Sequence, residues 1–183
     1  FDGYNFTANI CFELRDSKLH IVFDSCIFKI GDGITITLGL YLLEVENITV
    51  IDSYFNDFDY SIILIGCKNI IVHESEFNNT HRRTVDVRES STDIVIEGCN
   101  FLNGIWGPCF DGGDRIEIVN SYFNNFTERM IYVRKANRFL LRNITSENGY
   151  ILRTFDTKYI NLYNITTNDS FISMSDYDNA ILE

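Results

Sequence analysis

Two carboxylates flank a glycine pair in the segment Asp111-Gly-Gly-Asp114, and Trp106, the only tryptophan, lies five residues upstream. Carboxylate oxygens in such an arrangement are suited to bind calcium, or to act as acid and base on a glycosidic bond. A nearby indole ring offers a surface on which a sugar can stack. Asp111 and Asp114 are therefore candidate catalytic or calcium-binding residues, and Trp106 is a candidate sugar-binding residue.

The same charged residues also have a structural interpretation. The repeat described below aligns residues from successive turns of chain, and neighbouring strands lie about 4.8 Å apart. Opposite charges aligned in this way predict ion pairs between neighbouring turns. The predicted columns are Glu89–Asp111–Arg134, Asp93–Arg115 and His73–Glu97. This structural role is the one we expect for Asp111, with calcium binding and catalysis as the alternatives.

The histidines and cysteines do not form a recognisable set of metal ligands. The five cysteines show no C-x-x-C spacing, which argues against a zinc site. Cys26 and Cys99 occupy a repeat position that otherwise holds serine, which predicts small buried side chains. Disulfides between Cys99 and Cys109, or between Cys11 and Cys26, are left open by the spacing.

A repeat of about 22 residues carries all these side chains and runs through nearly the whole chain. Six copies of a line such as Asn47-Ile-Thr-Val-Ile-Asp-Ser-Tyr-Phe begin at residues 47, 69, 93, 115, 138 and 159, at spacings of 22, 24, 22, 23 and 21. An earlier copy begins at His20, 27 residues before Asn47. Self-similarity at this period predicts a solenoid.

Each copy has the pattern of short strands joined by turns. Apolar residues alternate, as at Ile48 and Val50, which predicts a strand with one buried face. A second apolar run, such as residues 62–65, predicts another strand in the same coil. One phenylalanine per copy predicts a stack of rings inside the solenoid, formed by Phe28, Phe55, Phe77, Phe101 and Phe123. Two positions later, a turn is predicted at Asp57, Asn79, Asn103 and Asn125.

These patterns predict an all-β fold without helices. The leucine-rich repeat, which has a similar period, is disfavoured because no stretch has helical periodicity and its L-x-x-L-x-L-x-x-N line is absent. We predict a right-handed, single-stranded parallel β-helix of about seven to eight coils, each of about 22 residues. Residues 1–183 form one domain in this prediction.

Lines of the form I-x-V-x-x-S-x-F-x-N, such as residues 48–57 and 116–125, resemble the β-helix repeats of the pectin-lyase-like superfamily. The resemblance covers roughly residues 10–183 and implies the right-handed parallel β-helix fold. It implies no single function, because the superfamily includes lyases, glycosidases, epimerases, tailspikes, adhesins and surface proteins. The Asn-Thr-Asp and Gly-His-Gly motifs of its polygalacturonases do not occur in this sequence.

The ends and one insertion depart from the regular repeat. Residues 1–7 resemble residues 123–127, which places Phe1 in the phenylalanine column, and residues 180–183 begin another coil. We therefore expect an excerpt of a longer chain, or open ends that stack into a filament. An insertion spans about residues 29–39. It is either a binding loop or, as we favour, an extra hairpin strand formed by Ile34, Ile36 and Leu38.

The charge and the sequons bear on partners and localisation. The net charge of −11, from 15 Lys+Arg and 26 Asp+Glu, argues against sequence-independent nucleic-acid binding and against anionic membranes. No apolar run is long enough to cross a bilayer. Seven Asn-x-Ser/Thr sequons predict a glycoprotein of the secretory pathway, located at the cell surface or outside the cell. They are Asn5, Asn47, Asn78, Asn125, Asn143, Asn164 and Asn168.

Three functions agree with these residues. The first, which we favour, is a non-enzymatic extracellular rod, structural or adhesive, that carries glycans and assembles end to end or binds surface glycans. The second is a carbohydrate-active enzyme, of the polysaccharide lyase or glycoside hydrolase type, that uses Asp111 and Asp114. The third is a glycan-binding module with Trp106, Tyr54 and Tyr122 as stacking surfaces. None requires a cofactor, and calcium is the one ion that Asp111 and Asp114 suggest.

Overall fold

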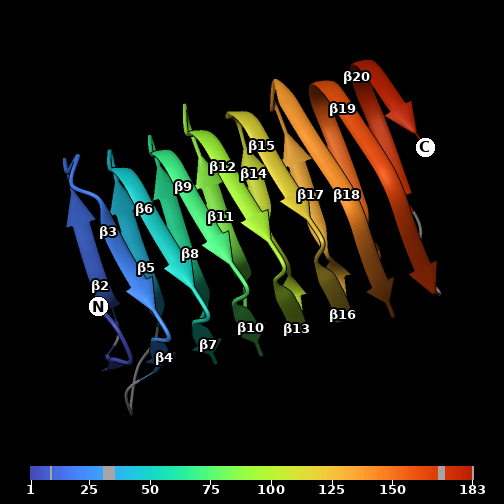
Figure 1. The fold of residues 1–183 in the computed structure, drawn as a ribbon. Coiled ribbons are helices and arrows are strands. Elements are labelled where there is room, and N and C mark those ends of the chain that lie inside the picture. Colours follow the sequence, from blue (N-terminus) through green and yellow to red (C-terminus); the bar gives the residue numbers. More distant parts are fainter. Residues whose placement is uncertain (9, 31–35, 169–171, 183) are drawn as a thin grey trace.

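A computed structural model of the chain describes residues 1–8, 10–30, 36–168 and 172–182. These residues form twenty strands and no helix, so the described part contains no helix that could cross a membrane. The strands wind into a parallel solenoid of about 8 turns, as the repeat predicted. In Figure 1 the coils lie side by side in sequence order, from the N-terminal end to the C-terminal end.

The strands pair in parallel to form three sheets that run along the rod. The first sheet contains β2 (Ile10–Arg15), β5 (Leu38–Leu43), β8 (Tyr60–Ile65), β11 (Arg83–Arg88), β14 (Cys109–Asp111) and β17 (Ile131–Arg134). The second contains β3 (Ile21–Asp24), β6 (Glu46–Ile51), β9 (Lys68–His73), β12 (Thr92–Glu97) and β15 (Asp114–Val119). The third contains β1 (Asn5–Thr7), β4 (Ile27–Lys29), β7 (Tyr54–Asn56), β10 (Glu76–Asn78), β13 (Asn100–Trp106) and β16 (Tyr122–Arg129).

Toward the C-terminal end the strands become longer and each extends over more than one sheet. They are β18 (Arg138–Glu147), β19 (Leu152–Asn168) and β20 (Ile172–Leu182). β18 pairs with both β15 and β16, and β19 pairs with both β17 and β18. The corners between sheets are thus less sharply marked here than in the first coils.

The predicted phenylalanine stack forms the centre of the core. Successive rings are nearly parallel, with centroids 4.4 to 5.0 Å apart, and all five are fully buried. The prediction that Phe1 opens this column is wrong. Phe6 occupies that place because it pairs in register with Phe28, and the two rings stack at 4.8 Å. Phe1 stacks instead on Phe23 at 5.2 Å.

The small residues before each phenylalanine have a polar role at the corner between the second and third sheets. The Ser53 hydroxyl accepts a hydrogen bond from the amide N–H of Cys26 in the preceding coil at 3.1 Å. It also donates a hydrogen bond to the Ile51 carbonyl at 2.8 Å. Such a hydroxyl satisfies a buried amide where a larger side chain would not fit. All five cysteines are free thiols, so neither of the two disulfide alternatives is formed.

The predicted turn column directly follows the strands β7 and β10, and it lies within the longer strands β13 and β16. Asp57, Asn79, Asn103 and Asn125 all have left-handed backbone, with φ of 67°, 56°, 53° and 60°. Asparagine and aspartate tolerate this conformation better than most residues. Side-chain amides also bond from coil to coil, as when Asn125 Nδ2 donates to Asn103 Oδ1 at 2.9 Å.

The predicted insertion of residues 29–39 is described only in part. Ile34 lies among residues 31–35, outside the described residues, and Ile36 has an exposed side chain. Leu38 is the first residue of β5, where it pairs in parallel with Ile10 and Tyr60. The C-terminal part of the predicted insertion therefore belongs to the first sheet.

Candidate functional site

The glycine pair between Asp111 and Asp114 forms the corner that leads from the first sheet to the second. Gly112 and Gly113 have φ of 95° and 98°, a region that side chains avoid. A Cβ on Gly112 would lie 2.6 Å from the carbonyl oxygen of Glu89 in the preceding coil. The glycines are therefore explained by the close packing of successive corners.

Asp111 lies at the end of β14, in register with Arg88 of the preceding coil and Arg134 of the following one. The predicted ion pair with Arg134 is present, with Nε donating to Oδ1 at 2.9 Å. The hydrogen bonds from Arg134 to the Asp111 carboxylate lower the pKa of Asp111. The prediction that Glu89 shares this column is wrong by one residue. Three residues separate β11 from β12, whereas two separate β14 from β15, so Glu89 falls opposite Gly112.

Asp114 begins β15 and binds a different set of donors. Arg138 Nε donates to it at 2.7 Å, Arg115 Nη1 at 2.9 Å and Asn137 Nδ2 at 3.1 Å. The hydrogen bonds from Arg138 lower the pKa of Asp114. Both candidate carboxylates are thus ionised near neutral pH, and they bind different arginines. Among the described residues, no group of three or more His, Cys, Asp or Glu side chains could hold a metal ion.

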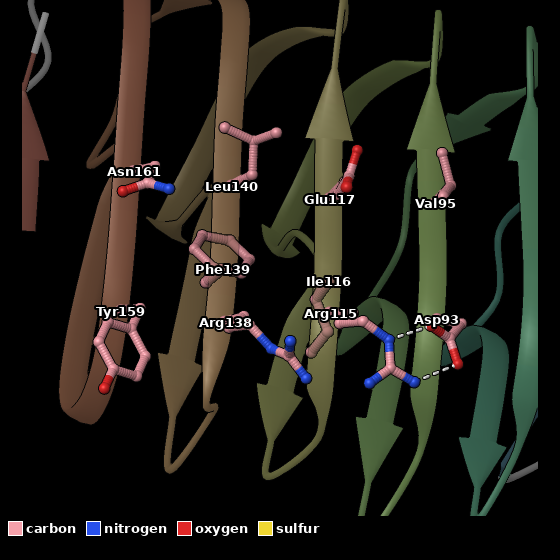
Figure 2. A pocket seen from close by; sticks show the side chains of 10 residues that line it. All are labelled: Asp93, Val95, Arg115, Ile116, Glu117, Arg138, Phe139, Leu140, Tyr159 and Asn161. Atoms are coloured by element: carbon pink, nitrogen blue, oxygen red, sulfur yellow. Dashed lines mark hydrogen bonds and ion pairs between the residues drawn. The ribbon is translucent and has the colours of Figure 1, made fainter.

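A groove of about 590 Å³ runs over the outward side of the second sheet, across β12, β15, β18 and β19 (Figure 2). Leu140 contributes to its apolar lining, and Tyr159 has about half of its surface exposed. The predicted pair of Asp93 and Arg115 lies at this groove, with Arg115 Nη2 donating to Asp93 Oδ2 at 2.6 Å. Arg138 is the second arginine that lines the groove, and it binds Asp114. The positive charges at the groove are therefore already paired.

A second candidate surface lies mainly on the outward side of the first sheet, and we call it the arginine–aromatic face. It consists of Tyr60, Arg82, Arg83, Arg88, Trp106, Arg129, Tyr132 and Arg134. Asp59, Asp86 and Asp111 lie among these side chains. Five arginines against three aspartates give the face an excess of two positive charges, in a chain whose net charge is −11. The face therefore differs in sign from the molecule as a whole.

Cations and aromatic rings alternate along one column of this face. Strand pairing aligns Tyr60 with Arg83, Arg83 with Trp106, and Trp106 with Arg129. The Arg83 guanidinium carbon lies 5.9 Å from the centre of the Trp106 ring, and that of Arg129 lies 4.7 Å from it. Tyr132 contacts the Trp106 ring edge to face at 5.6 Å. Cation–π contacts at these distances hold the rings and the guanidinium groups in place.

One buried carboxylate lies under the arginines. Asp86 is on β11 between Val85 and Val87, whose side chains are in the core, so strand alternation directs Asp86 outward. It is nevertheless 0% exposed. Arg83 Nη1 donates to Asp86 Oδ1 at 2.8 Å, and Arg88 Nε donates to Oδ2 at 2.8 Å. Burial lowers the pKa of Arg83, but the hydrogen bond and charge of Asp86 outweigh it and raise that pKa overall.

The other predicted stacking residues lie elsewhere. Tyr54 and Tyr122 share an outward column of the third sheet, as expected, but Glu76 and Asn100 lie between them in that column. The Tyr54 hydroxyl bonds to Asn56. The two tyrosines are therefore not neighbours. Of the three predicted stacking residues, Trp106 is the one that lies in the arginine–aromatic face.

Several sequon asparagines already use the nitrogen to which a glycan would be attached. Asn143 Nδ2 donates to Asn120 Oδ1 at 2.8 Å, and Asn164 Nδ2 donates to Asn143 Oδ1 at 3.0 Å. Asn78, Asn125 and Asn47 also donate through Nδ2. Asn5 is exposed on the short terminal strand β1, and Asn168 ends β19. These hydrogen bonds give the repeated asparagines a structural role that is independent of glycosylation.

The three parallel sheets, the inner phenylalanine stack and the asparagine corners place the chain in a fold class. It has the right-handed parallel β-helix fold, as the repeat lines predicted. A similar solved structure is that of endopolygalacturonase I from Stereum purpureum, complexed with two galacturonate. The TM-score is 0.68 at 10% sequence identity, over 98% of this chain and 68% of that chain. At this identity the likeness shows the fold alone. No protein-family model and no curated protein matches the sequence.

Sequence reasoning found Trp106 and Asp111 but missed the arginines and Asp86 that lie near them. The segment Arg83-Thr-Val-Asp-Val-Arg contains the available signal. It places a carboxylate in the middle of an apolar strand, with a cation near each end. A charge at such a position requires a partner, and the two flanking arginines are the nearest candidates.

Proposed function

We propose that this β-helix is a carbohydrate-binding protein, and that its arginine–aromatic face binds an acidic polysaccharide. The observation that carries the proposal is the column in which Tyr60, Arg83, Trp106 and Arg129 alternate along the rod. Aromatic rings stack on sugar rings, and guanidinium groups bind carboxylates with two parallel hydrogen bonds. A polymer with repeated carboxylates suits a surface on which cations recur from coil to coil.

The similar fold supports this choice of ligand class. The Stereum purpureum protein was solved with galacturonate, a sugar acid, and is named as a polygalacturonase. Sugar acids offer both groups that the arginine–aromatic face is suited to bind, a pyranose ring and a carboxylate. The excess positive charge of the face also favours an anion over a neutral glycan.

Binding agrees better with the carboxylates than cleavage does. A glycosidase needs one carboxylic acid that is protonated at the working pH and a second carboxylate at a defined distance from it. Arg134 and Arg138 lower the pKa values of Asp111 and Asp114, so both residues are poor proton donors. We therefore assign Asp111 a place in the binding face and Asp114 a structural role.

The test is the affinity of the purified chain for polygalacturonate and for neutral dextran, measured by isothermal titration calorimetry at low salt. We expect binding of the acidic polymer only, with at least about tenfold loss in Trp106→Ala, because truncated aromatic anchors dominate such surfaces. Tyr159→Ala, in the groove of Figure 2, should bind as the wild type does. Loss of binding in Tyr159→Ala alone would place the ligand in the groove. No binding of the acidic polymer by the wild type refutes the proposal, and release of reducing ends would establish the enzyme alternative.

A structural or adhesive rod is the second candidate, and it can coexist with binding. The supporting observation is the continuity of the core, in which five phenylalanine rings stack without a break. Such columns make a solenoid stiff along its axis. End-to-end contact between copies is the corresponding partner, and sedimentation velocity at increasing concentration tests it. A single species of constant size at all concentrations would exclude assembly.

The extracellular setting belongs to the same proposal. The seven sequons support a secreted or cell-surface protein, and Asn5 is an exposed acceptor on a short strand. Intact mass before and after enzymatic removal of N-glycans, for the chain secreted by a eukaryotic host, is the measurement. A mass that does not change would remove the sequon argument. Calcium remains a proposal for Asp111 and Asp114 that the same calorimeter tests, with a titration of calcium chloride.

A further inference from the structure

We infer that Asp86 is the positioning residue of the arginine–aromatic face, a buried carboxylate that holds Arg83 and Arg88 ready to bind an anionic ligand. The inference rests on the proposed function, because it assigns a role within the same binding face. It goes beyond that function, since Asp86 is fully buried and does not touch the ligand itself.

The position of Asp86 explains why two arginines are fixed by one carboxylate. Arg83 donates to one oxygen, and Arg88 donates to the other through both Nε and Nη2. Among the described residues with less than a tenth of their surface exposed, Asp86 is the only one with a charged side chain. A carboxylate withdrawn from water is tolerated only when charged donors satisfy it. The hydrogen bonds to Asp86 therefore fix the positions of both arginines.

The two arginines keep free donors at the surface. A guanidinium has five N–H groups, and Arg83 and Arg88 spend only some of them on Asp86. Their side chains remain 34% and 41% exposed. A ligand carboxylate thus meets donors whose orientation is already set. Less side-chain freedom is lost on binding, and preorganisation of this kind raises affinity.

Asp86 also acts on the aromatic part of the face through the arginines. The guanidinium of Arg83 lies over the Trp106 ring at 5.9 Å, and that of Arg88 lies over the Tyr60 ring at 5.9 Å. One buried carboxylate therefore links both stacking rings to a fixed pair of cations.

The neighbours of Asp86 within the first sheet add no competing charge. In register, Asp86 lies between Ile63 of β8 and Cys109 of β14. Burial raises the pKa of the Cys109 thiol to about 12, so this group is neutral near pH 7. Asp86 is therefore the carboxylate of these strands to which Arg83 and Arg88 donate hydrogen bonds.

The test compares Asp86→Asn with Asp93→Asn, a matched control in which another aspartate that pairs with an arginine is changed on a different sheet. Polygalacturonate affinity and its dependence on salt are measured for both variants and for the wild type. We expect about tenfold weaker binding in Asp86→Asn, with a changed salt dependence, and wild-type binding in Asp93→Asn. Melting curves establish whether Asp86→Asn is folded. If it is not, Asp86→Glu, which keeps the charge but moves the arginines outward, takes its place with the same expected direction.

A second readout needs no ligand and separates the two proposals. The signals of the donating groups, Nη1–H of Arg83 and Nε–Hε of Arg88, should be shifted and protected from exchange in ¹⁵N NMR spectra of the wild type, and should lose both features in Asp86→Asn. If the wild type binds no acidic polymer, the proposed function fails, whereas these signals still decide whether Asp86 fixes the arginines. Unchanged signals, or a folded Asp86→Asn that binds with wild-type affinity and salt dependence, would overturn the inference.

Discussion

Truncation of Phe77 is the most direct test of how this solenoid is stabilised. Phe77 is 0% exposed, and its ring stacks on Phe55 at 5.0 Å and on Phe101 at 4.9 Å. Replacing a buried phenylalanine with alanine costs about 3–5 kcal/mol, through lost burial and the cavity that remains. Each ring pair contributes about 0.5–1.5 kcal/mol of that loss. We expect the same range for Phe101→Ala and Phe123→Ala.

A less drastic substitution separates burial from stacking. Phe77→Leu keeps an apolar side chain in the core but removes both ring contacts, so about 1–3 kcal/mol of destabilisation is expected. Ile71→Ala is the matched control on the neighbouring strand β9, because Ile71 points outward and is 44% exposed. It should change stability by less than about 0.5–1 kcal/mol.

Urea unfolding measures these losses. Circular dichroism reports the strands, and Trp106, as the single tryptophan, reports one coil by fluorescence. Coincident curves from the two probes license a single free energy of unfolding. A double-mutant cycle with Phe77→Leu and Phe101→Leu then gives the ring coupling, expected at about 0.5–1.5 kcal/mol. A loss at Phe77→Ala as small as that at Ile71→Ala, or zero coupling between the rings, would refute the stacked core.

Three further predictions concern the thiols, the carboxylates and the asparagine ladder. Burial raises the pKa of Cys109 to about 12, so iodoacetamide at pH 8 should label it in urea but not in the native chain, as peptide mass spectrometry would show. Arg138 lowers the pKa of Asp114, so this contribution to stability is present above the unfolded pKa of about 3.9 and is lost as pH falls through the lower folded value. Asp114→Asn should therefore reduce the drop in melting temperature between about pH 5 and pH 3. Asn143 has φ of 53° and two ladder bonds. Asn143→Ala should cost about 1–2 kcal/mol in urea unfolding, and Asn143→Gly less, because glycine tolerates the backbone.

Features that recur at one place in every coil could be predicted from the sequence. The phenylalanine stack is such a feature, because each ring stacks on its counterparts in the neighbouring coils. The left-handed corner at Asn103 and Asn125 is another, because residue type and backbone conformation are locally linked. In both cases the prediction required the period of the repeat and nothing about the lengths of individual turns.

Features that depend on how long a particular corner is could not be predicted in the same way. The corner after β11 has one residue more than the corner after β14, which moved Glu89 out of the column of Asp111 and put Arg88 there. Phe1 lies outside the phenylalanine column for a similar reason, because Phe6, five residues later, is the residue that pairs with Phe28. A shift of one residue changes which side chains meet, since successive residues of a strand face opposite sides.

The arginine–aromatic face combines both kinds of feature, and this explains why no motif marks it. Its members come from strands β8, β11, β13, β16 and β17 and from Arg82, which directly precedes β11. The pairing of β13 with β16 contains a register shift between Gly104 and Trp106. The shift places Arg129 beside Trp106, which a constant period would not do. In a solenoid, side chains on neighbouring coils are about one repeat apart in the sequence. The residues of one binding surface are therefore spread over several copies of the repeat. Asp86 is the one member of this arrangement that the sequence of a single strand is enough to predict. A carboxylate between two valines, with an arginine near each end of the strand, cannot lie in the core unpaired. The strand sequence therefore predicts that these arginines are its partners and that they lie on the outward side of the sheet.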